Sequence, residues 1–185
     1  YAGTITGGNF YVDSGEIRFN GEAKTAAPTR VASICHMKGT GLFYGVSNYG
    51  TVSPGNSIGT MTIDVDDYTH QTGSNLIIEF DDASNSSAIN VLNGNDFIIA
   101  SDSTLTLLPQ IGEHIPGTYT FVTADGVVTN TFDNLNIQFP ERLGGLDVTL
   151  LKGDQDYRFQ LSGTNSIISN NAFMLSLTSD LSRKM

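Results

Sequence analysis

The sequence has one cysteine, no tryptophan and no long hydrophobic run. A single thiol, at Cys35, excludes an internal disulfide framework, and we interpret it as a small buried apolar side chain. No apolar stretch approaches the roughly 20 residues of a membrane-spanning helix, so we expect no direct membrane insertion. Residues 1–6 are already strand-like and show no signal-peptide pattern, so we interpret the chain as a piece of a longer protein.

Basic residues are also scarce. Lys and Arg total 9 against 19 Asp and Glu, which gives a net charge of −10. This balance repels phosphate backbones and anionic lipid surfaces, so we expect no nucleic-acid partner. Charged residues make up only 15% of the chain, but apolar residues recur at strand spacing throughout, which indicates a folded core.

The clearest pattern lies in residues 50–80. Two runs there alternate apolar side chains with others: Met61, Ile63 and Val65, then Leu76, Ile78 and Phe80. Residues 53–57 precede the first run and residues 70–74 separate the two. Their Pro, Gly and Asn residues favour bends. This pattern predicts two strands with turns before and between them.

The rest of the chain repeats short apolar runs between glycine-containing bends, which predicts an all-β solenoid, sandwich or barrel. The repeat is too irregular to give a period. Residues 146–150 and 157–161 alternate on both sides of a short loop, which predicts an antiparallel hairpin. Phe173, Leu177 and Leu181 have helical spacing, so the tail is either the start of a helical linker or a frayed end.

Two short patterns resemble nucleophile sites, but each has a simpler interpretation. Residues 55–59 match the Gly-x-Ser-x-Gly elbow of α/β-hydrolases, but that motif needs a helix after Ser57, and a β-branched strand follows instead. Cys35 and His36 are adjacent, and adjacent strand residues point to opposite faces. We therefore expect an ordinary turn, an inert buried Cys35 and a surface His36, and no enzyme activity.

The acidic residues form small clusters near predicted bends. Solvated turns are the simplest interpretation, and a weak Ca²⁺ site is the alternative, although no 12-residue calcium loop is present. The three histidines, His36, His70 and His114, have no second ligand at helical metal spacing. We therefore expect no catalytic, cofactor-binding or metal site. The clusters are Asp64, Asp66 and Asp67, then Asp81 and Asp82, then Asp154 and Asp156.

Aromatic residues are spread along the predicted strands. Facing inward they would form core ladders, and facing outward they would form platforms for sugar rings. The sequence leaves both interpretations open.

Residues 50–60 (GTVSPGNSIGT) resemble a motif near the end of many bacterial autotransporter (type V secretion) passenger domains. In that family a β-helix strand is followed by a Pro-Gly-Asn-Ser turn and a second strand. The resemblance departs from the family at residues 87–91, where an Asp often follows the Ser. It otherwise continues in the same order through residues 67–76, 105–107, 117–127 and 131–135.

The resemblance implies a right-handed parallel β-helix with a C-terminal cap of antiparallel character. Residues 1–89 would form coils of the passenger stem, residues 90–163 the cap or autochaperone-like region, and residues 164–185 the start of a linker to a membrane barrel. A cap is also expected physically, because an uncovered last coil exposes unpaired backbone groups and an apolar end.

The function implied is a non-catalytic stem that nucleates and caps β-helix folding during outer-membrane export. Its partners would be upstream passenger coils and a C-terminal membrane β-barrel of the parent chain, at the bacterial surface or in a secreted product. The alternative is an adhesin module that binds host glycans or proteins. A pectin-lyase-like enzyme is the least favoured class, because no convergent basic cluster is evident.

Two sets of residues follow from this interpretation. The structural motif consists of Pro54, Gly55, Asn56, Ser57 and Gly59, of which we expect Gly55, Asn56 and Gly59 to be conformational requirements. The predicted folding core consists of Met61, Ile63, Leu76, Ile78, Tyr119, Phe121, Leu146, Val148 and Phe159.

Overall fold

The computed structural model describes residues 1–81 and 85–164. Its strands form three sheets, and a short 3₁₀ helix, η1, spans Pro140–Leu143. In spatial order, sheet A contains β1 (Thr4–Thr6), β4 (Glu22–Lys24), β7 (Leu42–Phe43), β10 (Thr60–Ile63), β13 (Ala88–Val91), β16 (Gly117–Ala124), β20 (Asp156–Ser162) and β19 (Asp147–Lys152). Sheet B contains β2 (Tyr11–Val12), β5 (Thr29–Val31), β8 (Val46–Asn48), β11 (Tyr68–His70), β14 (Phe97–Ile99) and β17 (Val128–Thr129). Sheet C contains β3 (Glu16–Arg18), β6 (His36–Gly39), β9 (Thr51–Pro54), β12 (Asn75–Phe80), β15 (Thr104–Pro109) and β18 (Asn134–Ile137).

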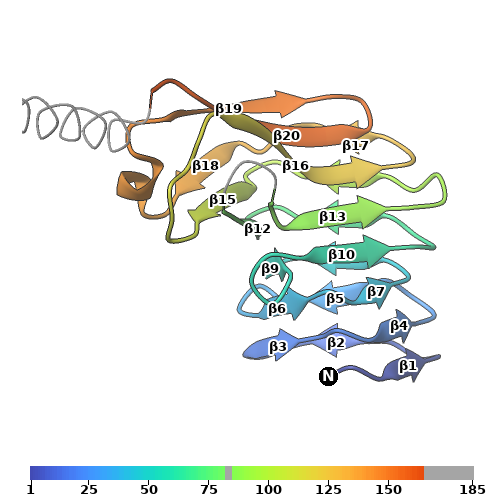
Figure 1. Ribbon diagram of the computed structural model, residues 1–185. Helices are drawn as coiled ribbons and strands as arrows, with labels where there is room; N and C mark the ends of the chain where they lie inside the picture. Colours follow the sequence, from blue (N-terminus) through green and yellow to red (C-terminus); the bar gives the residue numbers. More distant parts are fainter. Residues whose placement is uncertain (82–84, 165–185) are drawn as a thin grey trace, which may run out of the picture.

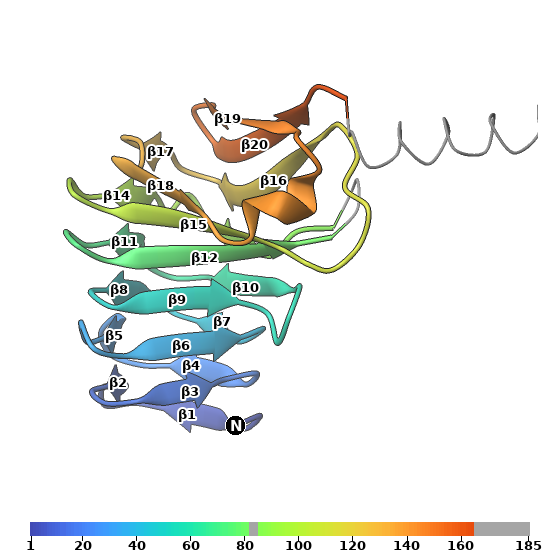
Figure 2. The same cartoon turned by 90° about the vertical axis from the view of Figure 1, so that its left-hand side faces the viewer.

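The chain visits the three sheets in turn, so each three consecutive strands form one coil, from coil 1 (β1–β3) to coil 6 (β16–β18). Each strand of coils 1 to 5 pairs in parallel with the strand three places on, as β10 does with β13. The coils lie one above another (Figure 1 and Figure 2). The all-β prediction is confirmed, and the stacked parallel sheets are consistent with a β-helix-like solenoid.

Inward side chains stack in register along the coils. Met61 on β10 lies beside Ile89 on β13, and Ile78 on β12 lies beside Leu107 on β15. All four side chains are fully buried. Because alternate residues of a strand point to opposite faces, the apolar alternation in the sequence becomes a continuous core along the stack.

The two strands predicted in residues 50–80 are β10 and β12. The sequence interpretation missed β11, a three-residue strand between them, and placed His70 in a bend. A strand this short gives almost no periodic signal. The first predicted run was also too long, because β10 ends at Ile63 and Val65 is 55% exposed.

The antiparallel part is smaller than predicted. Parallel pairing continues beyond residue 90 through β16, β17 and β18. Among the strands of the described residues, antiparallel pairing is confined to the hairpin β19–β20 and its contact with β16. The predicted hairpin is confirmed. The predicted tail, including Phe173, Leu177 and Leu181, lies outside the described residues, as does Asp82.

Candidate functional site

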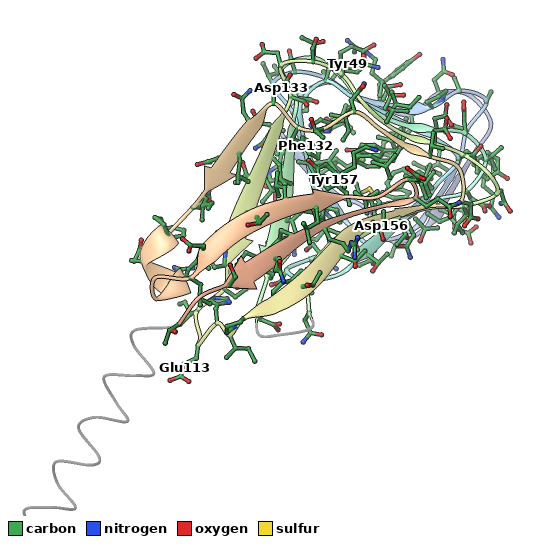
Figure 3. The ribbon with its side chains drawn as sticks, turned by 90° about the horizontal axis from the view of Figure 1, so that it is seen from above. Tyr49, Glu113, Phe132, Asp133, Asp156 and Tyr157 are labelled. Atoms are coloured by element: carbon green, nitrogen blue, oxygen red, sulfur yellow. The ribbon has the colours of Figure 1, made fainter. Side chains whose placement is uncertain are left out.

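The C-terminal end of the stack is closed by the hairpin β19–β20. Strand β20 pairs with β16, the last parallel strand of sheet A, and β19 pairs with the far side of β20. Seen along the stack, the hairpin lies across its end (Figure 3). The outermost strand, β19, begins with Asp147 and ends with Lys152, both exposed. Charges on an edge strand discourage further pairing with other chains.

An aromatic cluster lies beneath this hairpin. Phe159 on β20 stacks on Tyr119 of β16 with ring centroids 4.6 Å apart, and it contacts Phe80 of β12 at 4.8 Å. Tyr157 packs against Phe121 at 5.0 Å. All five rings are at most 1% exposed. Aromatic contacts of this geometry add about 0.5–1.5 kcal/mol per pair beyond the burial of their area, so the cluster ties the hairpin firmly to coil 6.

Phe132 extends the closure to the side of sheets B and C. It lies between β17 and β18, is 7% exposed, and packs on Tyr157 with ring centroids 5.6 Å apart. Burial raises the pKa of Tyr157, partly offset by a hydrogen bond to the backbone of Phe132. Figure 3 shows both rings within the end of the stack. Phe132 lies within residues 131–135 of the family resemblance, but no alternation marks it as a core residue, because no regular strand surrounds it.

Helix η1 anchors the chain between β18 and the hairpin. The Arg142 guanidinium donates to the backbone carbonyl of Pro109 (2.9 Å) and lies 4.1 Å from the ring centre of Phe139. Leu143 and Leu146 are buried. These contacts connect the segment before the hairpin to β15, the strand of sheet C below it.

No hairpin covers the first coil within the described residues. Strands β1, β2 and β3 are each the last strand of their sheet, so one edge of each has no partner strand among the described residues. The inward side chains Ile5 and Ile17 pack on the core but remain partly exposed. Tyr1, stacked on Phe19 at 5.5 Å, is 62% exposed. This end therefore presents both apolar side chains and unpaired strand edges.

Nearly all predicted core residues are buried. Val148 differs: it is only partly buried, because it lies on β19, the edge strand of sheet A, where it packs against the core from outside the stack. The buried residues of the predicted set are Met61, Ile63, Leu76, Ile78, Tyr119, Phe121, Leu146 and Phe159.

The predicted turn motif depends on its two glycines. Gly55 has φ +95°, and a Cβ there would lie 2.4 Å from the carbonyl oxygen of Ser57. A Cβ on Gly59 would lie 2.9 Å from the Cα of Gly55. Pro54 is buried at the end of β9. The expectation for Asn56 is wrong: it is exposed and does not have a positive φ, so the turn does not require asparagine there.

The possible nucleophiles are not assembled into sites. The hydroxyl of Ser57 donates to Glu79 (3.2 Å), and strand β10, not a helix, follows the turn. Cys35 is 3% exposed. The His36 imidazole lies 3.3 Å from Glu16 on the outer face of sheet C. Burial, followed by the charge of Lys38, lowers the pKa of His36.

The first acidic cluster, at residues 64–67, connects successive coils. The Asp67 carboxylate accepts a hydrogen bond from the backbone N–H of Asp96 one coil above (2.8 Å), and Asp96 accepts one from Val127 in the next coil (2.8 Å). Asn93 donates to the Asp64 carboxylate (2.8 Å). The Asp67 and Asp96 carboxylates therefore satisfy backbone donors that the turns leave unpaired. In residues 1–81 and 85–164, no three His, Cys, Asp or Glu side chains are grouped to hold a metal ion.

Comparison with known proteins adds no relative. No helix in the described part of the chain is long and apolar enough to cross a membrane. No protein-family model matches the sequence, and a search of curated proteins returned no significant match.

Proposed function

We propose that this chain is the C-terminal stem of an autotransporter passenger, a right-handed parallel β-helix without catalytic activity. Its closed end would fold first and cap the helix, and its open end would receive the preceding coils during export across an outer membrane. The upstream passenger coils and a C-terminal membrane β-barrel of the parent chain are its proposed partners. Its proposed location is the bacterial surface or the secreted passenger.

The closed C-terminal end carries this proposal. There, a hairpin and a cluster of buried aromatic rings cover the last coil. Among the described residues, β1, β2 and β3 each keep one edge without a partner strand, and Ile5 and Ile17 are partly exposed. A stack of this kind can grow at one end only, because each added coil buries its apolar face against the last one.

The order of folding follows from chain connectivity. Strands β19 and β20 are separated by a short turn, so little loop-closure entropy opposes their pairing. The parallel coils pair residues about 20 or more positions apart, as Glu22 with Leu42 and Thr60 with Ala88, and benefit from a preformed edge. Coils stacking on that edge would help to draw the chain outward without ATP.

A surface-display assay tests the proposal. Ile78→Asp in the full-length parent places a carboxylate at a fully buried position of β12 and should reduce display of the passenger several-fold or more. Phe121→Asp should do the same from β16. Ile77→Asp is the matched control, because Ile77 is the neighbouring, partly exposed residue of the same strand and should leave display nearly unchanged. Normal display of both core variants would contradict the folding role.

One observation favours an adhesin module as a second candidate. Tyr11 and Arg30 are register partners on the outer face of sheet B, and the Arg30 guanidinium lies 5.0 Å from the ring centre of Tyr49. Tyr11 is 50% exposed and Tyr49 39% exposed. Exposed tyrosines beside arginine are typical of binding surfaces. Measurable binding of a glycan or protein by the isolated chain, lost in Tyr11→Ala, would favour this candidate.

A further inference from the structure

His70 lies fully buried on β11, in the fourth coil. Its Nδ1 lies 3.2 Å from the side-chain nitrogen of Asn48, its register partner in the coil below. The other end of that amide is fixed, because the Asn48 oxygen accepts the backbone N–H of Gly50 (2.9 Å). The Asn48 nitrogen can only donate, so Nδ1 of His70 must accept. The fold therefore requires a neutral imidazole with its proton on Nε2.

The side chains that the structure pairs with His70 are uncharged, so none of them would stabilise an imidazolium. Its neighbours are Asn48 from the coil below, Tyr68 on its own strand (ring centroids 6.2 Å apart) and Ile99 from β14 above. The Phe132 ring lies at 73° to the imidazole with the ring centroids 5.2 Å apart. Tyr68 is the titratable group among them, and burial raises its pKa, so it stays neutral. Protonation of Nδ1 would place two N–H groups against each other.

The electrostatics agree with this geometry. Burial lowers the pKa of His70 from 6.5 to about 4, and backbone hydrogen bonds at Ser74 and Thr104 oppose that change only in part. Desolvation disfavours the charged form of a buried histidine because the surrounding rings and amides replace water poorly.

The position of His70 gives its charge state a structural consequence. Phe132, which contacts His70, also packs on Tyr157 and closes one side of the C-terminal end. Next to it, Asp133 borders a surface hollow lined also by Ala100, Ser101, Asn130, Thr131 and Lys152. The backbone carbonyl of His70 accepts the N–H of Ala100 (2.8 Å), so the hollow lies beside this strand. If the turn at residues 130–133 lifts, the imidazole loses the cover of the Phe132 ring and gains water.

We propose that His70 makes the contact between coil 4 and the C-terminal end sensitive to acid. Its protonation releases Phe132 and the turn at residues 130–133 that carries it. The turn at residues 130–133 then opens in acid, while the hairpin β19–β20 and the coils remain in place. The inference concerns the isolated chain and does not depend on the proposed export function.

The sign of the pH dependence follows from linkage. The folded state binds the proton more weakly than the unfolded state, so the contribution of neutral His70 is complete above about pH 6.5. It is lost as the pH falls from there toward 4. At pH 4.5 the folding equilibrium constant should have fallen on the order of 50–100-fold from this group alone.

Urea unfolding at pH 7 and pH 4.5 of wild type and His70→Asn tests the proposal. Asparagine keeps an acceptor toward Asn48 but cannot titrate. The folding equilibrium constant of wild type, divided by that of His70→Asn, should therefore fall on the order of 50–100-fold from pH 7 to pH 4.5. Carboxylate titration affects both proteins and cancels. The control is His36→Gln, on the partly exposed outer face of sheet C. The ratio of the wild-type folding equilibrium constant to that of His36→Gln should change far less between the two pH values.

Two measurements on the wild type keep the test independent of how well the variant folds. An NMR titration should give the His70 ring a pKa near 4, and amide exchange at pH 4.5 should rise first in residues 128–135. A His70 ring that titrates near pH 6.5 in the folded protein would overturn the proposal. Equal pH dependence of wild type and variant, or equal loss of protection in all coils, would do so as well.

Discussion

Replacing Phe159 with alanine is expected to lower the free energy of unfolding by about 3–5 kcal/mol. The Phe159 ring contacts Tyr119, Phe80 and Phe121, with centroids 4.6, 4.8 and 6.2 Å away, and is fully buried. Its removal leaves a cavity between the hairpin and coil 6, because β20 is fixed to β16 by backbone hydrogen bonds and cannot collapse freely. Urea denaturation followed by circular dichroism measures the change.

Phe139→Ala provides the matched control for this prediction. Phe139 is also an aromatic residue near the C-terminal end, but its ring is 47% exposed and contacts the Arg142 guanidinium. We expect Phe139→Ala to lower the free energy of unfolding by about 1 kcal/mol or less. Equal losses in the two variants would mean that the aromatic cluster does not hold the hairpin in place.

Removing the hairpin is expected to abolish cooperative folding, whereas removing coil 1 is not. A chain of residues 1–144 lacks β19 and β20 and exposes the faces of Tyr119, Phe121 and Phe80 to water. A chain of residues 21–164 loses β1–β3 but presents β4–β6 as a new open end of the same kind. Residues 1–164 are the reference. Urea titration measures how cooperatively each of the three proteins unfolds, and dye binding measures how much apolar surface each exposes.

The physical reason for this difference is the nature of the two ends. Loss of one coil from a stack removes one interface and leaves the others intact, whereas loss of a cap exposes an apolar end that nothing replaces. A cooperative transition in residues 1–144 similar to that of the reference would contradict the capping role. Complete unfolding of residues 21–164 would show that coil 1 is not a separable addition.

Alternation of apolar residues was enough to predict a strand wherever one face of the strand is apolar and the other polar over several residues. Met61 and Ile63 on β10, and the hairpin around residue 153, are examples. The solenoid period was not visible because the coils differ in length. Register partners are 18 residues apart for Thr4 and Glu22, but 28 apart for Thr60 and Ala88 and 33 apart for Ile89 and Val122. Longer connections between sheets C and A, and the longer strands β12, β15 and β16, cause this change in spacing.

The candidate site was less predictable, because it depends on contacts between distant segments. Phe132 and Leu143 lie outside regular strands, and nothing local indicates that they complete the closed end. His70 looked like a bend residue because it is followed closely by the turn residues Gly73 and Ser74, and the three-residue strand β11 that it ends is too short to show alternation. The glycines Gly55 and Gly59 were predictable from turn chemistry, whereas Asn56 shows that turn composition alone does not identify which residue the backbone requires.

Native-state hydrogen exchange of the intact chain at increasing urea concentrations tests most directly whether the C-terminal end is the stable, self-folding part. The amides of β16 and β20 should exchange only through global unfolding, and those of β1–β3 should open at much lower urea, with coils 2 to 5 in between. This gradient is the result that a template growing toward its N-terminus requires. Earlier opening of β16 and β20 than of β1–β3 would contradict the account.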